Sequence, residues 1–514
     1  MKVLYVCSEV APYAKSGGMA DVAQALPAAL QKAGAEVMVV MPLYACVDRE
    51  KYKLTCKFKA SCVHMGAREE WFSVYYTDQP NGVPTYFVEY GNFFNRYGMY
   101  ADEHFRSYGD NGWRYAFFSR AALQTAQDLG FRPDIVNVND WMTCLIPYYL
   151  KRQGGDFFAG SKSVLTIHNL GHHGIFPAEL MHYAMIDGWD FNPNAFEAYG
   201  QINLMKGGIT FADKINTVSP TYARETLTPQ YGCGLHDYLR RREADYVGIL
   251  NGIDSSWVPL YDSLLPIRYG ATDYKGAKAS VKRDIQRQFG LEEKADVPLF
   301  ACINRFVEQK GVAILPEAVE RSLQTMSCQF LFVSNGEKSA EDAFGRSLPA
   351  RFPGRIAAYI GYKEPLAHLV NAAADFYLMP SLYEPCGLNQ MYAQAAGSLP
   401  IVRATGGLDD SVEQYDEIAG AGTGFKFNAF TGGALFDTMG WAVSTYYDRP
   451  RHMDAMIRQS MTKDTSWGAA TVKYLSLYNQ ALGEDKTPRI SLVAKPTAVV
   501  AEAEAEPEEQ SKAA

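Results

Sequence analysis

Two cationic side chains, Arg305 and Lys310, are close enough in the sequence to bind one anion together. They lie in the segment 304–311, which follows a predicted strand near the start of a helix, so both can point into one pocket. Arginine makes bidentate contacts to phosphate oxygens and lysine supplies a point charge, a combination that suits a diphosphate. Taken alone, the segment is equally well explained by two solvated charges on a helix.

A carboxylate, Glu384, is the most informative residue of the segment 381–390. We expect it at the end of a strand, with Pro385 and the residues after it opening a helix. The free N–H groups of such a helix can hold a phosphate, and Glu384 beside them can accept hydrogen bonds from two sugar hydroxyls. The Gly406-Gly407 pair follows the next predicted strand and brings the backbone near the same ligand.

In the first half of the chain, the run Lys15-Ser16-Gly17-Gly18-Met19-Ala20-Asp21 follows the first predicted strand. Gly17 and Gly18 let backbone N–H groups approach a ligand, and the helix that begins there has a partly positive end to which Lys15 adds a full charge. The spacing is not that of a P-loop, and a plain strand-to-helix turn needs the same glycines.

Three further residues follow predicted strands, where the ligands of open α/β sheets bind. Asp140 and His168 carry polar groups, whereas Tyr362 can stack on a base or cover the edge of the sheet. A structural role is the default for Asp140 or His168 alone. His172 and His173 lie close to His168 in the sequence, but no carboxylate or cysteine occurs near them at the spacing of metal ligands. We therefore expect no metal site.

The elements that must position these residues form two series of short apolar runs that alternate with helical patterns, the signature of parallel sheets covered on both faces. The first series comprises predicted strands at 3–10, 37–43, 135–138, 164–167 and 215–218, with a helix over 19–33 and a hairpin-like insertion over about 51–90. The second comprises strands at 299–303, 330–333, 356–360, 376–379 and 400–402.

This pattern predicts two α/β domains, over residues 1–249 and 250–461, with the chain crossing between them at Asn251-Gly252-Ile253-Asp254. We expect a last helix within 462–483 to pack back on the first domain. Residues 484–514 are rich in Ala and Glu and are predicted to be a disordered tail.

Composition excludes several classes of protein. The 514 residues are 47% hydrophobic and 21% charged, as in ordinary globular proteins. A net charge of -8 without a long basic block makes nucleic acid an unexpected partner. The nine cysteines include no C-x-x-C pair and indicate reduced thiols. No apolar run reaches membrane-spanning length, so we expect no membrane association. The absence of export signals predicts a cytoplasmic location.

Together these residues resemble the bacterial glycogen synthase and plant starch synthase family, over nearly the whole chain to about residue 480. The Lys15–Asp21 run is similar to the family's Lys-Thr-Gly-Gly-Leu-Ala/Gly-Asp signature. The other matching segments are Tyr108-Gly109-Asp110-Asn111, Thr166-Ile167-His168-Asn169-Leu170, Asn251-Gly252-Ile253-Asp254, Gln309-Lys310-Gly311 after Arg305, Glu384-Pro385-Cys386-Gly387-Leu388 and Thr405-Gly406-Gly407-Leu408.

The resemblance implies a GT-B type glycosyltransferase, with two Rossmann-like doubly wound domains facing across a cleft. It implies a retaining transfer of glucose from ADP-glucose to the non-reducing end of an α-1,4-glucan, either glycogen or a maltooligosaccharide, with release of ADP. The first domain would be the acceptor side and the second would bind the nucleotide sugar. No metal and no cofactor is implied, because cations and helix ends supply the charge.

The resemblance also implies roles for individual residues. Arg305 and Lys310 would stabilise the leaving diphosphate, and Lys15 with Gly17 and Gly18 would bind phosphate from the other domain. Glu384 would hold glucose hydroxyls and His168 would lie by the reacting carbon. The remaining expected contacts are Cys386, Gly387, Leu388 and Asn389 on the distal phosphate, Tyr362 on adenine, and Glu9, Asp21, Asp140 and Asn251 on the sugar and acceptor side.

Position 392 agrees with the glycogen and starch synthases, whereas the segment 139–142 departs from their usual sequence. Sucrose-synthesising and many lipid-modifying enzymes of this fold carry a second Glu eight residues after the first, where this chain has Tyr392. The family commonly has His-Asp-Trp-His or His-Asp-Trp-Gln, where this chain has Asn139-Asp140-Trp141-Met142. This departure bears on the fit of the acceptor more than on the donor.

Other functions stay open at this point. One alternative is a glucosyltransferase of the same fold that uses UDP-glucose as the donor or transfers to a small acceptor. A glucan phosphorylase would need pyridoxal phosphate on a lysine. A non-catalytic glucan-binding protein would have no reason to keep Lys15, Arg305, Lys310 and Glu384 together.

Overall fold

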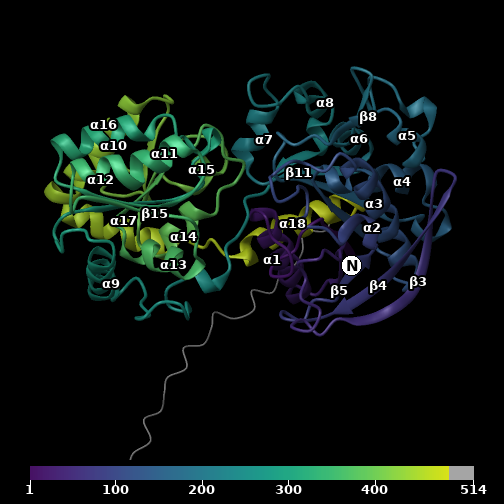
Figure 1. Ribbon diagram of the computed structural model, residues 1–514, viewed down its shortest axis with the longest axis horizontal. Helices are drawn as coiled ribbons and strands as arrows, with labels where there is room; N and C mark the ends of the chain where they lie inside the picture. Colours follow the sequence, from purple (N-terminus) through teal and green to yellow (C-terminus); the bar gives the residue numbers. More distant parts are fainter. Residues whose placement is uncertain (485–514) are drawn as a thin grey trace, which may run out of the picture.

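The computed structural model describes residues 1–484. The chain forms two α/β halves that lie side by side (Figure 1). Apart from Glu484, the tail expected over residues 484–514 lies outside the described residues.

A nine-stranded sheet forms the centre of the first half, in the order β12-β11-β7-β6-β1-β2-β5-β4-β3. Its middle strands are almost entirely buried and mostly apolar, as expected for a parallel sheet covered on both faces. The strands are β1 (Lys2–Val6), β2 (Glu36–Pro42), β3 (Thr55–Met65), β4 (Arg68–Thr77), β5 (Thr85–Glu89), β6 (Ile135–Asn139), β7 (Lys162–Ile167), β11 (Lys214–Thr217) and β12 (Tyr246–Gly248). The first strand ends at Val6 and not at Val10, where a turn already leads toward α1.

The segment expected as an insertion belongs to this sheet. Strands β3 and β4 form an antiparallel hairpin, but β5 pairs in parallel with β2, from Val39 opposite Thr85 to Pro42 opposite Val88. The hairpin therefore extends the main sheet at one edge. A separate small sheet has the order β8 (Ile175–Pro177), β10 (Gln201–Asn203) and β9 (Glu197–Ala198).

The helices of this half are α1 (Gly18–Lys32), α2 (Gly91–Phe94), α3 (Asn111–Asp128), α4 (Leu145–Gln153), α5 (Leu180–Tyr183), α6 (Leu204–Phe211), α7 (Pro220–Thr226) and α8 (His236–Arg240).

The second half has a six-stranded parallel sheet in the order β15-β14-β13-β16-β17-β18. Its strands are β13 (Leu299–Ile303), β14 (Gln329–Ser334), β15 (Ile356–Ile360), β16 (Phe376–Met379), β17 (Leu399–Arg403) and β18 (Phe425–Phe427). Its helices are α9 (Tyr274–Gln288), α10 (Leu315–Thr325), α11 (Lys338–Asp342), α12 (Leu348–Arg351), α13 (Glu364–Ala373), α14 (Asn389–Ala395), α15 (Gly406–Ser411), α16 (Gly432–Asp448) and α17 (Pro450–Thr462).

Each half has its own hydrophobic core. The core of the second half lies within residues 265–457, whereas that of the first runs from Val3 to Ile249 and then takes up the last helix, α18 (Trp467–Ala481). Tyr474 and Tyr478 of α18 are fully buried, and the Tyr478 hydroxyl donates to Asn137 Oδ1 of β6 at 2.6 Å. The yellow α18 accordingly lies among the purple and blue elements of the first half (Figure 1).

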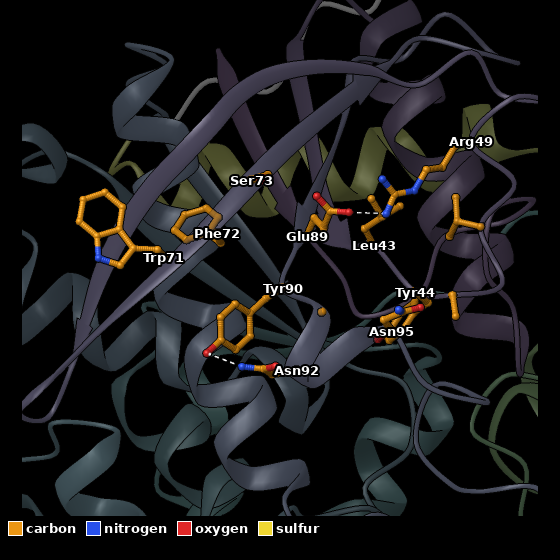
Figure 2. A pocket seen from close by; sticks show the side chains of 13 residues that line it. Leu43, Tyr44, Arg49, Trp71, Phe72, Ser73, Glu89, Tyr90, Asn92 and Asn95 are labelled. Carbon is orange, nitrogen blue, oxygen red and sulfur yellow. Dashed lines mark hydrogen bonds and ion pairs between the residues drawn. The ribbon is translucent and has the colours of Figure 1, made fainter.

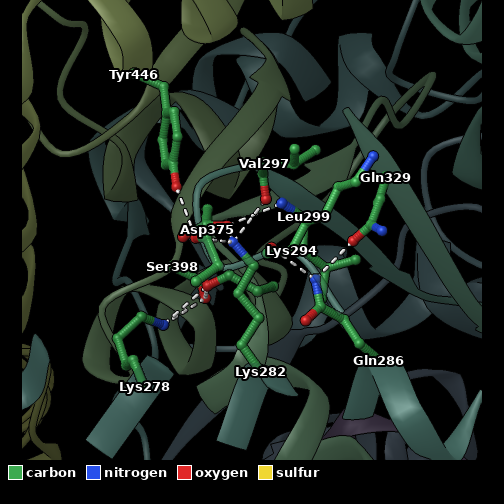
Figure 3. Close-up of polar contacts among 12 residues, drawn as sticks. Lys278, Lys282, Gln286, Lys294, Val297, Leu299, Gln329, Asp375, Ser398 and Tyr446 are labelled. Atoms are coloured by element: carbon green, nitrogen blue, oxygen red, sulfur yellow. Dashed lines mark hydrogen bonds and ion pairs between the residues drawn. The ribbon is translucent and has the colours of Figure 1, made fainter. Parts of the chain in front are cut away.

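Helix α9 buries a row of polar side chains, Lys278, Lys282 and Gln286, which recur every four residues on one face (Figure 3). Lys278 Nζ donates to the carbonyls of Ala372 and Ala374, each at 2.8 Å. These bonds satisfy carbonyl groups at the end of α13, where a helix leaves them without partners. The row thereby fixes α9 beneath the second sheet.

Candidate active site

The loop between β1 and α1 is held by a carboxylate from within the same turn. Glu9 is buried, and it accepts hydrogen bonds from Ser16 Oγ at 2.9 Å, from the Gly17 N–H at 3.3 Å and from the Tyr100 hydroxyl at 3.1 Å. Burial raises the pKa of Glu9, and these hydrogen bonds oppose the rise. Glu9 therefore fixes the shape of the glycine turn.

Lys15 and the two glycines lie on the outer side of this turn. Lys15 Nζ pairs with Asp21 Oδ1 at 2.7 Å while half of the lysine side chain stays exposed. Helix α1 begins at Gly18 with Gly17 as its N-cap, as the sequence indicated. A Cβ added at Gly17 would meet nothing within 4 Å, and one at Gly18 would lie 3.6 Å from Leu388 of the second half. The turn thus faces Leu388 with its backbone accessible.

Asp140 ties the ends of two neighbouring strands together. Its Oδ1 accepts from the backbone N–H of His168 at 2.7 Å and from that of Asn169 at 3.4 Å. Asp140 has φ of 53°, a left-handed conformation that costs free energy in a residue with a Cβ. Burial raises the pKa of Asp140 to about 7, with the two N–H groups acting in the opposite direction. In this arrangement Asp140 positions His168.

His168 follows β7 and is half-buried. Its ring Nε2 lies 2.9 Å from Asn139 Oδ1 at the end of β6. Burial lowers the pKa of His168 to about 3, so the ring is neutral at physiological pH.

In the second half, Lys310 and Glu384 form an ion pair, although 74 residues separate them in the sequence. The carboxylate of Glu384 is buried and also accepts from Ser381 Oγ at 3.0 Å. Arg305 is exposed after β13, and its guanidinium has no ion pair among residues 1–484. One expected cation is therefore already neutralised, and the other is free to meet an anion.

The turn from Glu384 to Asn389 packs against a second glycine turn. A Cβ at Gly406 would collide with the carbonyl oxygen of Glu384, and one at Gly407 with that of Cys386. The Gly407 N–H donates to the Glu384 carbonyl at 3.0 Å. These glycines allow two backbone segments to approach closely, whereas the sequence had led us to expect a close approach of the backbone to a ligand.

Helix α14 begins at Asn389, not at Pro385 as expected, because Gly387 has φ of 70° and a left-handed residue cannot continue a helix. Asn389 turns its side chain inward, where Nδ2 donates to the Ile303 carbonyl at 2.7 Å. Cys386 is buried beside Asn251, and burial raises the pKa of its thiol to about 12 while hydrogen bonds to Asn251 oppose the rise. Asn251 Oδ1 is buried and has no hydrogen-bond partner within residues 1–484.

Tyr362 follows β15 and has 59% of its surface exposed. Asp21 of α1 and Glu364 both contribute to a raised pKa of this tyrosine, after the larger effect of burial. Tyr362 thus stands on the side of the second half that faces α1.

A direct contact between the halves involves α7 and α15, which meet between them (Figure 1). Thr221 donates to Asp410 from both its N–H and its hydroxyl, each at 2.7 Å. Glu225 accepts from Thr405 Oγ1 at 2.9 Å and from the Gly406 N–H at 3.1 Å. This contact could not be predicted from the sequence, because Ser219-Pro220 indicates only that a helix begins there and not which residues the helix will contact.

The structure also contains a hollow of about 410 Å³ away from these residues (Figure 2). It is lined by residues of β4 and β5 and of the segment after β2, among them Trp71, Tyr90 and the ion pair between Arg49 and Glu89. None of the site residues expected from the sequence lines this hollow.

Within residues 1–484, no group of three or more His, Cys, Asp or Glu side chains could hold a metal ion. No helix in the same range is long and apolar enough to cross a membrane.

Two α/β domains with cations, glycine turns and a carboxylate after their strands define a two-domain glycosyltransferase of the GT-B fold. Residues 2–241 match the family described as starch synthase catalytic domain, and residues 283–433 match glycosyl transferases group 1. The chain belongs to the family of bacterial glycogen synthases and starch synthases.

Individual relatives are similar over almost their whole length. Glycogen synthase 1 of Geobacter metallireducens is 45% identical over 488 residues, 94% of this chain and 96% of the relative. Glycogen synthase of Bacillus subtilis is 39% identical over 93% of this chain and 98% of the relative. The catalytic domain of starch synthase IV from Arabidopsis thaliana, solved bound to ADP and acarbose, has a TM-score of 0.86 at 30% identity, covering 94% of this chain and 99% of that one.

Proposed function

We propose that this protein transfers glucose from ADP-glucose to the non-reducing end of an α-1,4-glucan, with retention of configuration and release of ADP. Residues 250–461 would bind the nucleotide sugar, and residues 1–249 would bind the acceptor. The observation that carries the proposal is the Lys310–Glu384 ion pair, which puts a cation for phosphate beside a carboxylate for sugar hydroxyls.

The chemistry requires stabilisation of the charge that develops on the diphosphate as the glycosidic bond breaks. Arg305 is the free cation after β13, and Lys310 becomes available when the donor takes over its interaction with Glu384. Fixed cations aimed at a leaving group are worth most in the transition state, so they raise the turnover rate more than the affinity. Glu384, freed from Lys310, can accept hydrogen bonds from two hydroxyls of the glucose.

The first domain would contribute Lys15 and the N–H groups of Gly17 and Gly18 to the phosphates. The closeness of Gly18 to Leu388 supports this assignment, because it brings the glycine turn to the segment that starts α14. His168 would lie by the reacting carbon, with Glu9, Asp21, Asp140 and Asn251 around the sugar and acceptor. Tyr362 would stack on the adenine, and Cys386, Gly387 and Asn389 would complete the phosphate side.

ADP as the leaving nucleotide is favoured by the plant starch synthase named above, which was solved with ADP bound. The alternative is UDP-glucose, which would need the same cations and carboxylate and would differ only at the base.

The experiment is a release assay for both nucleotides, with ADP-glucose or UDP-glucose as donor, each with and without glycogen. We expect release of ADP that depends on glycogen, and much slower release of UDP. Faster release of UDP would overturn the choice of donor. Release that is the same without glycogen would mean hydrolysis in place of transfer.

A further inference from the structure

Asn139 is the last residue of β6, at the position where this chain departs from the family's usual histidine. Its side chain is fully buried between the ends of β1 and β7. Asn139 Nδ2 lies 2.9 Å from the carbonyl oxygen of Val6. A backbone carbonyl can only accept a hydrogen bond, so the amide nitrogen, and not the amide oxygen, must face Val6.

The orientation of the amide decides what the opposite atom can do. Asn139 Oδ1 lies 2.9 Å from His168 Nε2 and 3.0 Å from the hydroxyl of Tyr5. An amide oxygen has no hydrogen to donate, so both neighbours must donate to it. His168 Nε2 therefore carries a proton, and in a neutral imidazole Nδ1 is then the unprotonated nitrogen.

Burial keeps the ring of His168 neutral, and no carboxylate within residues 1–484 pairs with the ring. The carboxylate of Asp140 accepts from the backbone N–H of His168 and not from the ring. Burial alone accounts for the low pKa of His168, about 3. Within residues 1–484 no hydrogen bond to Nδ1 is present, and His168 keeps part of its surface exposed.

We propose that Asn139 is a positioning residue, which holds the neutral ring of His168 in the Nε2–H tautomer so that Nδ1 is presented to the substrate as a hydrogen-bond acceptor. The functional part of this inference rests on the proposed function, because the substrate that donates to Nδ1 is a hydroxyl of the transferred or accepting sugar. His168 then orients a sugar and does not act as an acid. An amide does not titrate, so Asn139 offers the same acceptor to Nε2–H throughout the pH range in which the ring is neutral, which a histidine at position 139 would not ensure.

The tautomer can be observed directly in the full chain with ¹⁵N-labelled histidine, by long-range ¹H–¹⁵N correlation spectra. The signals of His168 are assigned as those lost in His168→Gln. We expect a protonated Nε2 and an unprotonated Nδ1 from pH 6 to pH 8. A protonated Nδ1 would overturn the proposal whether or not the protein transfers glucose, and the expected spectrum would stand even if ADP-glucose were not the donor.

Two variants separate positioning from stability. Asn139→Leu and Asn139→Asp both lose the bond to Val6, but only the aspartate keeps an acceptor for Nε2–H. We expect Asn139→Leu to lose the single tautomer and to lower kcat on the order of tenfold, the effect of one misplaced hydrogen bond, with a smaller change in KM for the donor. Asn139→Asp should keep the proton on Nε2, but its carboxylate raises the pKa of the ring, so kcat is compared above that pKa, where Nδ1 is unprotonated and most of kcat should remain. Equal loss of kcat in both variants, or an unchanged tautomer in Asn139→Leu, would contradict the positioning role.

Discussion

The ammonium of Lys310 is paired with the carboxylate of Glu384, and both groups are largely buried after neighbouring strands of the second sheet. The pair satisfies two charges that would otherwise be costly to bury. A diphosphate and a sugar offer each partner a replacement, since phosphate oxygens attract the ammonium and hydroxyls donate to the carboxylate. The free protein thus holds both groups where we propose that the donor binds.

Replacement of Glu384 by glutamine removes the partner of Lys310 without changing the shape of the side chain. Lys310 is then free for the diphosphate, so we expect ADP to bind at least as tightly as to the unchanged protein. Turnover should fall by about 10²-fold or more, because an amide accepts from the sugar hydroxyls less strongly than a carboxylate. Calorimetric titration with ADP and steady-state rates measure the two effects. A loss of ADP affinity as large as the loss of turnover would assign Glu384 to the folded structure instead.

The contact between α7 and α15 should limit how far apart the two halves lie in solution. Asp410→Ala removes both hydrogen bonds from Thr221. We expect a larger radius of gyration in small-angle X-ray scattering without ligand, and a decrease when ADP and a maltooligosaccharide are added. Asp284→Ala is the control, since Asp284 is exposed on α9 in the same half. A radius that is the same in Asp410→Ala and in the control would show that this contact does not limit the separation of the halves.

Lys278 predicts a dependence of stability on pH. Burial lowers the pKa of Lys278 to about 7, with Asp375 acting against the shift and Lys282 adding to it. The unfolded chain keeps an ordinary lysine pKa of about 10.4. Between these values the unfolded state binds more protons than the folded state, so this group makes the free energy of unfolding rise as pH rises, by up to about 1.4 kcal/mol per pH unit.

Lys278→Met should remove that part of the pH dependence. Urea unfolding at pH 7, 8 and 9 measures it as the difference in slope between the variant and the unchanged protein, which cancels the contributions of other groups. The variant also leaves the carbonyls of Ala372 and Ala374 without their buried donor, so we expect it to be less stable at pH 9. The same slope in both proteins would mean that Lys278 is protonated throughout this range.

Much of this architecture follows from local sequence pattern. The buried apolar runs predicted the second sheet from Leu299 to Val402 to within one or two residues, because fully buried parallel strands have few alternatives. The start of α14 was misplaced, because the pattern does not reveal that Gly387 adopts a left-handed conformation. The place of β5 in the main sheet depends on pairing with β2, which is distant in the sequence.

The contacts within the candidate site were likewise not predictable from local sequence patterns. Sequence patterns selected Lys310 and Glu384 separately, and only the fold shows that they pair. Glu9 and Asp140 were expected on the sugar and acceptor side, and in the structure each carboxylate accepts a hydrogen bond from a nearby backbone N–H group. A carboxylate after a strand has the same sequence signal whether it faces a ligand or its own turn. Thr221 and Glu225 carry no such signal, because their partners lie about 180 residues away.

The proposed function depends most on Arg305, which we assign as the free cation for the leaving diphosphate. The measurement that tests it is kcat with ADP-glucose and a maltooligosaccharide for Arg305→Ala, beside Arg346→Ala, which removes a largely exposed arginine of the same half. We expect Arg305→Ala to lower kcat by about 10²–10³-fold with a smaller change in KM, and Arg346→Ala to leave both unchanged. A kcat for Arg305→Ala within a few-fold of that of the unchanged protein would contradict the assignment of the diphosphate site.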